Sequence, residues 1–155
     1  MLLNNKWDYR FGEMAQLISS WSKDPSTQVG AVIVRPNKSI ASLGYNGFPP
    51  GVEDRPEWLL DRTKKLELMV HAEHNALNFC DHENITTSTI YVYPLHPCAK
   101  CAKRIFDRGI TRVVTVTTQE KHDYMSQPEV WSRYAFDMTF ALFDAFEIQH
   151  ETIIL

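Results

Sequence analysis

The feature that most constrains the fold is a set of metal-binding residue types split between two places in the chain. His71 and Glu73 form a His-Ala-Glu triplet, and Cys98 and Cys101 form a Pro-Cys-x-x-Cys segment further along. Zinc binds nitrogen and sulfur ligands tetrahedrally, and a catalytic site leaves one of the four positions for water. The fold must therefore bring the two segments together, with Glu73 free to move protons near that water.

Composition narrows the class of protein. The chain has 155 residues, 44% of them hydrophobic and 23% charged, and we expect a single domain over residues 1–155. A net charge of -3 argues against binding polymeric nucleic acid, which requires a basic face. Three cysteines, two of them in Cys-x-x-Cys, indicate a reducing, cytoplasmic location rather than a disulfide framework. The N-terminal residues lack the apolar run of a signal peptide, and no membrane span is expected.

Hydrophobic periodicity predicts alternating helices and strands. An apolar stripe at helical spacing runs from Trp7 to Trp21 and predicts a helix that stops near Lys23, because Pro25 disfavours helical geometry before it. The segment from Tyr45 to Asp54 is a loop rich in glycine and proline. Strands are expected over residues 30–34, 39–43, 89–93 and 112–116 and near residue 146, and helices over residues 57–69, from 72, over 98–108 and over 131–145. This alternation predicts a layered α/β domain.

The geometry of helices places a demand on the metal site. Residues two apart in a regular helix point in nearly opposite directions, so Glu73 can approach a metal bound by His71 only if His71 lies at the helix boundary. Cys80 would lie about 13 Å along the helix from His71, which excludes it as a ligand of the same ion. His74 and His96 remain candidates for a fourth ligand, so a structural zinc stays an alternative. A redox Cys-x-x-Cys is another.

The two motifs resemble the signature of the zinc-dependent nucleoside deaminase superfamily. This resemblance implies that His71, Cys98 and Cys101 bind one zinc ion (Zn2+), which lowers the pKa of a bound water. It also implies that Glu73 is the catalytic proton shuttle, which protonates the ring nitrogen and the departing ammonia.

Two further segments, residues 22–31 and 44–49, resemble the deoxycytidylate deaminase family. The resemblance implies a three-layer α/β/α cytidine-deaminase-like fold with a central mixed sheet of about five strands. It implies hydrolytic deamination of dCMP to dUMP and ammonia, which supplies thymidylate synthesis. Asn46 is assigned to the deoxyribose, although a turn asparagine is the alternative interpretation. The other candidate substrate-binding residues are Lys23, Ser26, Thr27 and Ala72, with Arg104 a second choice for the phosphate.

The same resemblance implies regulation and assembly. Family members are homohexamers that dCTP activates and dTTP inhibits together with magnesium (Mg2+). We place the candidate allosteric contacts at Tyr45, Gly47 and Phe48, although glycine at position 47 also suits a backbone requirement. Tyr124, Trp131 and Tyr134 could cover the base, but helical spacing favours a core position for Trp131, and no stacking residue is assigned.

Two other functions remain open from the sequence. One is deamination of another base, such as cytidine, a tRNA adenosine or a riboflavin precursor, because the zinc motif does not identify the substrate. The other is a zinc-stabilised module that binds a nucleotide without catalysis.

Overall fold

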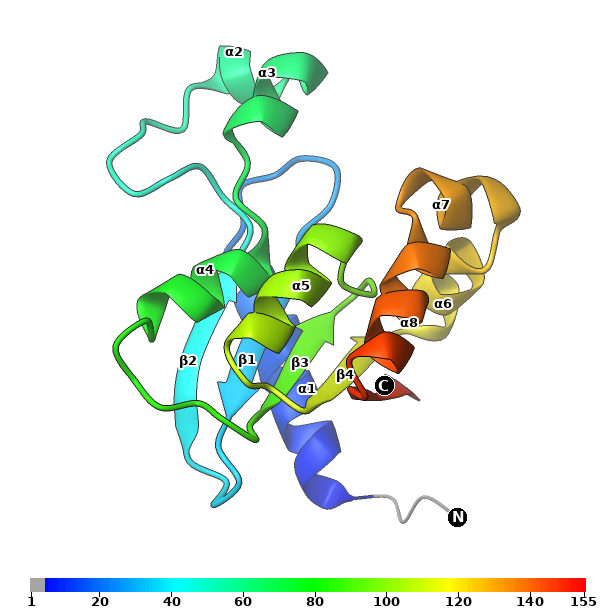
Figure 1. Ribbon diagram of the computed structural model, residues 1–155. Helices are drawn as coiled ribbons and strands as arrows, with labels where there is room; N and C mark the ends of the chain where they lie inside the picture. Colours follow the sequence, from blue (N-terminus) through cyan, green and yellow to red (C-terminus); the bar gives the residue numbers. More distant parts are fainter. Residues whose placement is uncertain (1–4) are drawn as a thin grey trace.

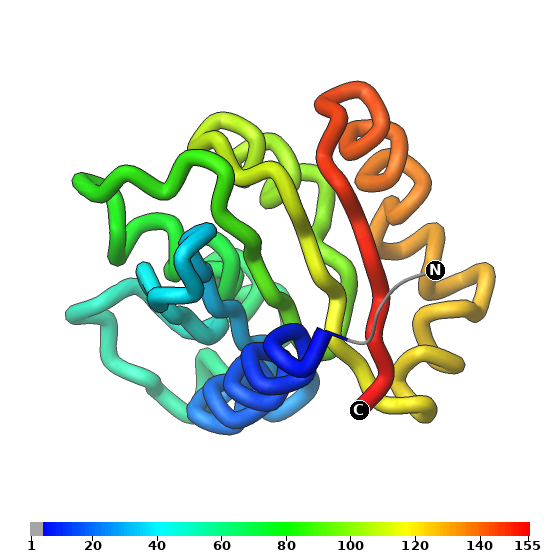
Figure 2. Tube along the Cα trace, turned by 90° about the horizontal axis from the view of Figure 1, so that it is seen from below, coloured from blue at the N-terminus to red at the C-terminus, as the bar shows by residue number. Residues whose placement is uncertain are grey.

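A mixed β-sheet forms the centre of the computed structural model, which describes residues 5–155 (Figures 1 and 2). Its five strands lie in the order β2-β1-β3-β4-β5, and β1 is antiparallel to both β2 and β3, whereas β3, β4 and β5 are parallel. This confirms the predicted mixed sheet. The strands are β1 (Gly30–Val34), β2 (Ile40–Tyr45), β3 (Thr89–Tyr93), β4 (Arg112–Thr117) and β5 (Gln149–Ile154).

Helices cover both faces of the sheet. Alternate residues of a strand point to opposite faces. Val32 and Val34 of β1 therefore pack against α1 (Lys6–Ser19) on one face. Ala31 and Ile33 pack in a second core, on the face covered by α4 (Ala72–Phe79), α5 (Ala99–Asp107) and α8 (Phe136–Ala145). Figure 1 shows α4 and α5 in front of the sheet with α1 behind it. The three-layer α/β/α fold is confirmed.

Helix α1 ends at Ser19, earlier than the predicted end near Lys23. The hydroxyls of Ser19 and Ser20 donate to the carbonyls of Gln16 and Leu17, each at 2.6 Å. Serine side chains that bond to the backbone compete with helix continuation. Trp21 consequently lies outside the helix, with 53% of its surface exposed.

The predicted helix over residues 57–69 is in fact two helices, α2 (Pro56–Leu59) and α3 (Arg62–Leu68). Asp61 interrupts it, because its side chain accepts a hydrogen bond from the Lys64 backbone N–H at 3.2 Å and so caps a new helix. In Figure 1 this pair of helices projects from one end of the domain.

The predicted helix over residues 131–145 is also divided, into α7 (Pro128–Arg133) and α8. Ala135 separates them with φ of 51°, a left-handed conformation that ends a right-handed helix. The sequence did not predict α6 (Gln119–Met125), which begins at a Thr118 cap, and the last strand starts at Gln149 rather than near Phe146. The remaining elements begin and end within two residues of their predicted bounds.

Three glycines differ in how strongly the structure requires a residue without a side chain. Gly109 has φ of +78° and follows α5, in the left-handed conformation that commonly ends a helix. A Cβ on Gly44 would lie 2.5 Å from the Ala76 backbone nitrogen, so β2 and α4 approach too closely for any other residue. Gly47 has no such restriction, because a Cβ there would meet nothing nearer than Tyr45 at 4.0 Å. The backbone requirement expected at Gly47 is therefore wrong.

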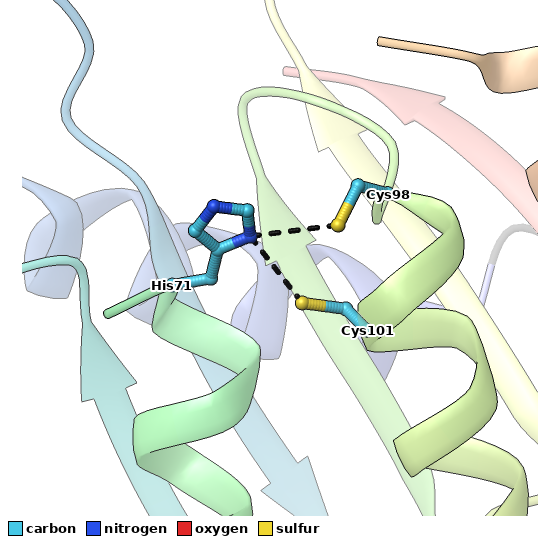
Figure 3. A group of neighbouring side chains, drawn as sticks. All are labelled: His71, Cys98 and Cys101. Carbon is cyan, nitrogen blue, oxygen red and sulfur yellow. Dashed lines mark hydrogen bonds between the residues drawn. The ribbon is translucent and has the colours of Figure 1, made fainter. Parts of the chain in front are cut away.

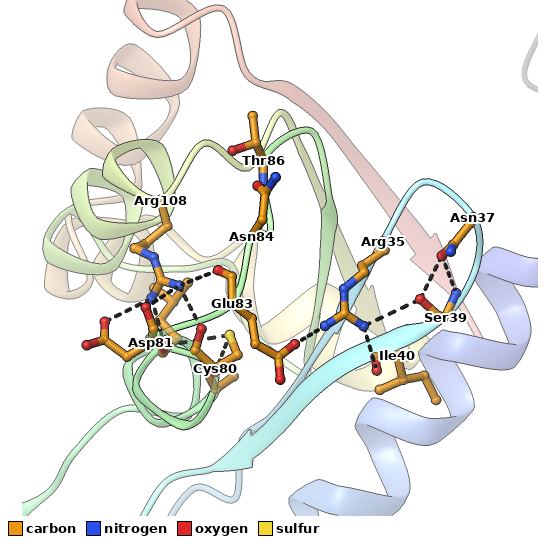
Figure 4. Close-up of polar contacts among 12 residues, drawn as sticks. Arg35, Asn37, Ser39, Ile40, Cys80, Asp81, Glu83, Asn84, Thr86 and Arg108 are labelled. Atoms are coloured by element: carbon orange, nitrogen blue, oxygen red, sulfur yellow. Dashed lines mark hydrogen bonds and ion pairs between the residues drawn. The ribbon is translucent and has the colours of Figure 1, made fainter.

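Arg108 holds the C-terminal end of α4 in place (Figure 4). Its guanidinium donates to the carbonyls of Leu77 at 2.8 Å and Cys80 at 2.9 Å, and it pairs with Asp81. An ion pair between Arg35 and Glu83 ties the following loop to the β1–β2 turn. These contacts satisfy carbonyls that a helix end leaves without partners. No helix among residues 5–155 is long and apolar enough to cross a membrane.

Candidate metal centre and substrate pocket

The beginnings of two helices meet on one side of the sheet (Figure 3). His71 is the N-cap of α4, with φ of -66° and ψ of 151°, and Cys98 is the N-cap of α5, with φ of -75° and ψ of 168°. Both residues have extended backbones, so their side chains project away from the helices they precede. The predicted boundary position of His71 is confirmed.

The three donor atoms have the spacing of a tetrahedral zinc site. His71 Nδ1 lies 3.5 Å from Cys98 Sγ and 3.5 Å from Cys101 Sγ, and all three atoms lie within 4.8 Å of one another. Zinc–nitrogen and zinc–sulfur bonds of about 2.0 and 2.3 Å at tetrahedral angles require a nitrogen–sulfur distance of about 3.5 Å. The residues therefore fit zinc.

A fourth protein ligand is absent from this group within residues 5–155. Cys80 is buried elsewhere, and its thiol donates to the Ala76 carbonyl at 3.3 Å, which confirms its exclusion. His96 Nδ1 hydrogen-bonds to Thr115 Oγ1 at 2.8 Å instead of joining the group. Three ligands leave one tetrahedral position for water, as in catalytic zinc sites.

The electrostatics of the three residues favour metal binding. A hydrogen bond from the Cys101 thiol lowers the pKa of Cys98 to about 3, with a further contribution from His71 that acts against burial. The Cys98 thiolate in turn raises the pKa of His71 to about 9 and raises that of Cys101. Zinc binds thiolate and neutral imidazole, so an ion that binds here displaces protons from His71 and Cys101.

Glu73 lies beside the metal-binding residues without belonging to them. Its side chain is buried in the first turn of α4, and it lines the same pocket as His71 and Cys98. Burial raises the pKa of Glu73, and the positive charge of His71 and the influence of Cys101 act in the opposite direction. A buried carboxyl with a raised pKa next to a metal site has the character of a general acid–base group.

These residues open into a pocket of about 320 Å³. His71, Glu73 and Cys98 form part of its wall. The volume lies at the lower end of the range for small-molecule sites. Four of the predicted substrate-binding residues also line the pocket: Ser26, Thr27, Asn46 and Ala72.

Two predicted phosphate ligands lie outside the pocket lining. Lys23 forms an ion pair with Asp54 at 2.9 Å, and 67% of its side chain is exposed. Arg104 donates to Asn78 Oδ1 at 3.0 Å on the outer side of α5. The three candidate allosteric residues, Tyr45, Gly47 and Phe48, are also not part of the lining.

Asn46 fixes the loop that forms the pocket wall. Its Oδ1 accepts from the Val29 backbone N–H at 2.8 Å, and its Nδ2 donates to the Thr27 carbonyl at 2.9 Å. Both ends of the amide thus hold the backbone, which agrees with the turn interpretation. A contact with the sugar stays a prediction.

The sequence missed three cations in the pocket wall: Arg62, Lys65 and Arg133. Lys65 Nζ lies 3.0 Å from Asp24 Oδ1 and 3.1 Å from Ser26 Oγ, and it is buried. The spacing of Arg62 and Lys65, one helical turn apart, was visible in the sequence. This spacing did not place the two cations in the pocket, because the sequence predicted one helix over residues 57–69 and not a separate helix that begins at Arg62.

Of the aromatic residues considered for the base, Tyr134 lines the pocket. Trp131 stacks on Phe140 with a centroid distance of 5.4 Å and packs in a third core with Phe136, as expected for a core residue. Tyr124 packs against the same core.

Fold and site together define a metal-dependent α/β/α enzyme class with a His-Cys-Cys centre and a neighbouring glutamate. The family described as the cytidine and deoxycytidylate deaminase zinc-binding region matches residues 5–117. The chain belongs to this family. The predicted resemblance to deoxycytidylate deaminases is confirmed by relatives that bear this name.

Three relatives and one solved structure illustrate the similarity. An uncharacterized deaminase of Aliivibrio fischeri is 42% identical over 123 residues, covering 79% of this chain and 80% of its own. The deoxycytidylate deaminase of Mus musculus is 33% identical over 155 residues (97% and 85%), and that of Homo sapiens is 34% identical over 146 residues (91% and 80%). The dCMP deaminase of cyanophage S-TIM5 in complex with dCMP and dUMP has a similar fold, with a TM-score of 0.71 and 22% identity over 98% of this chain and all of the other.

Proposed function

We propose that this protein catalyses the hydrolytic deamination of dCMP to dUMP and ammonia. The observation that carries the proposal is the position of the Glu73 carboxyl beside a three-ligand metal centre in the wall of a nucleotide-sized pocket. The names of the curated relatives support dCMP as the substrate. In this proposal residues 1–155 act as one catalytic domain in the cytoplasm.

His71, Cys98 and Cys101 would hold the zinc ion. Zinc bound there supplies Lewis-acid chemistry, which makes water a good nucleophile at neutral pH. The free amide groups at the starts of α4 and α5 favour negative charge on the ligands that surround it.

Glu73 carries the protons of the reaction. Its carboxylate takes one proton from the water whose oxygen bonds to C4 of the base, and gives it to the ring nitrogen N3. The second proton passes through Glu73 to the exocyclic amine, which leaves as ammonia when the C4–N bond breaks. Burial of Glu73 raises its pKa, which makes the carboxylate a stronger base for the first proton transfer.

The rest of the pocket orients the nucleotide. We assign Asn46 to the deoxyribose and the Ser26 and Thr27 hydroxyls to the phosphate, and Ala72 lies next to Glu73 at the end that receives the base. Ordered contacts of this kind hold the reacting carbon against the nucleophile and so lower the entropic part of the barrier.

The experiment compares dCMP, deoxycytidine, cytidine, dCTP and an RNA hairpin as substrates of the zinc-loaded protein. The proposal expects dCMP to have the highest kcat/KM. A preference for an unphosphorylated nucleoside or for RNA would refute it. Glu73→Gln is expected to retain zinc, because Glu73 is not a ligand, and to lose activity by more than about 10⁴-fold. A variant that loses zinc, or one that stays active, would overturn the role of Glu73.

Regulation and assembly form a separate part of the proposal, supported by the family resemblance. We propose a homohexamer that dCTP activates and that dTTP inhibits with Mg2+, through a site that includes Tyr45, Gly47 and Phe48. Sedimentation measures the assembly, and dCMP turnover with each triphosphate measures the regulation. A lack of response to both triphosphates would eliminate the regulatory part without affecting the deaminase proposal.

A further inference from the structure

We propose that Arg62 and Arg133 form a clamp on the 5′-phosphate of the nucleotide and give the enzyme its preference for a nucleotide over a nucleoside. This inference rests on the proposed function, because it concerns the same pocket. It assigns the phosphate to residues different from Lys23 and Arg104, which the sequence had suggested.

The first argument is the charge of the pocket wall. Apart from the residues of the metal centre, Glu73 and His96, its charged residues are Asp24, Lys65, Arg62 and Arg133. Lys65 and Asp24 form an ion pair at 3.0 Å, with side chains only 6% and 7% exposed. Their charges cancel, and Lys65 is committed to Asp24 and the Ser26 hydroxyl. Two positive charges then remain on the arginines, which match the two negative charges of a nucleoside monophosphate.

The second argument is that both guanidinium groups have free donors. Among residues 5–155, neither Arg62 nor Arg133 forms an ion pair or a side-chain hydrogen bond, and both residues are exposed to solvent at the pocket. A guanidinium carries five N–H donors in a planar array that fits phosphate oxygens in pairs. Arg108 and Arg112, by contrast, are committed to protein partners.

The third argument is position. Arg62 lies one turn before Lys65 on α3, and Lys65 bonds to the Ser26 hydroxyl at 3.1 Å. Arg133 is the last residue of α7, and it and the following Tyr134 line the pocket together with Thr27. Both helices therefore border the loop that carries the two proposed phosphate hydroxyls. Figure 1 shows α3 and α7 projecting from different sides of the domain at this end.

The experiment measures kcat/KM for dCMP and for deoxycytidine with Arg62→Gln, Arg133→Gln and the double variant. Loss of one charge-assisted hydrogen bond at a solvent-accessible site is expected to lower the value for dCMP by about 10-fold, mainly through KM. In the double variant we expect kcat/KM for dCMP to fall about 100-fold or more. The value for deoxycytidine, which has no phosphate, is expected to stay unchanged. Arg133→Lys keeps the charge and is expected to recover part of the loss.

The matched control is Arg55→Gln. Arg55 lies in the same projecting segment, but it pairs with Glu53 at 3.1 Å, packs over Trp58 and does not line the pocket. This variant is expected to have the wild-type kcat/KM for both dCMP and deoxycytidine. Zinc content and thermal unfolding of every variant report whether the fold is intact.

Three outcomes would overturn the clamp. The first is an unchanged kcat/KM for dCMP in the double variant. The second is an equal loss for dCMP and deoxycytidine, which would show a structural role instead. The third is measured on the wild type alone and is a failure of deoxyribose 5-phosphate to inhibit the turnover of deoxycytidine. A wild type that does not deaminate dCMP at all would instead refute the proposed function, and this result is distinct from the other three.

Discussion

Replacing Lys65 with methionine tests whether a buried ion pair stabilises the projecting helices against the domain. Lys65 and Asp24 connect α3 to the loop after α1, at 3.0 Å and with little solvent access. The substitution keeps most of the side-chain volume and removes the charge. It leaves the Asp24 carboxylate buried without its cation.

The expected loss of unfolding free energy depends on the hydrogen bonds that the Asp24 carboxylate keeps. Removing one partner of a buried pair costs about 3–5 kcal/mol, because the other charge stays desolvated. Asp24 Oδ1 still accepts from the backbone N–H groups of Ser26 at 2.7 Å and Thr27 at 3.2 Å. We therefore expect the lower end, about 3 kcal/mol of unfolding free energy. In a domain of this size that corresponds to a decrease in Tm of about 6–12 °C.

Urea unfolding and thermal scans of the zinc-loaded protein measure the effect. Lys64→Met is the matched control, because the neighbouring lysine is 60% exposed and its ion pair with Asp61 is long, at 3.9 Å. An exposed pair contributes about 0–1 kcal/mol. The double variant Lys65→Met with Asp24→Asn is expected to recover at least half of the loss, since no charge remains buried. Equal stability of Lys65→Met and Lys64→Met would refute the reasoning.

Three further predictions concern other contacts. Gly44→Ala places a methyl group 2.5 Å from a backbone nitrogen of α4, so we expect a loss of about 1–3 kcal/mol or more and faster zinc loss to a chelator, measured by unfolding and chelator competition. Thr139→Val removes a buried hydrogen bond to the Pro97 carbonyl (2.9 Å), and we expect a loss of about 1–3 kcal/mol and weaker zinc binding by the adjacent cysteine. Burial alone would raise the pKa of Asp8, but hydrogen bonds, chiefly from Arg112, lower it below its ordinary value of 3.8. The folded state therefore favours the charged form. The stability advantage over Asp8→Asn should be constant at pH values well above 3.8 and decrease as the pH falls below 3.8, and an advantage that grows with acid would contradict the assignment.

The metal centre could be predicted from the sequence because its determinants are local. The spacing of Cys98 and Cys101 places both thiols within one helical turn. The need for Glu73 to face the same ion as His71 placed the helix boundary at His71, where the structure has it. Strand positions were predictable for a similar reason, since β-branched runs form buried strands in most contexts.

The wall of the pocket could not be predicted in the same way. Arg62 and Arg133 reach it because helices end at unexpected residues, and the side a helical residue faces depends on those ends. Asp61 offered a recognisable capping signal. Ala135 offered none, because alanine has no preference for the left-handed conformation that it adopts with φ of 51°. Tertiary packing of Phe136 into the third core accounts for this break.

The division of the site between early and late parts of the chain has a consequence for biosynthesis. The last proposed metal ligand is Cys101, whereas Arg133 and Tyr134 complete the pocket wall from the final third of the chain. Synthesis from the N-terminus therefore produces the full set of metal ligands before the residues that close the pocket. Since metal binding contributes folding free energy, zinc taken up at that stage would stabilise the nascent sheet and helices before a nucleotide could bind.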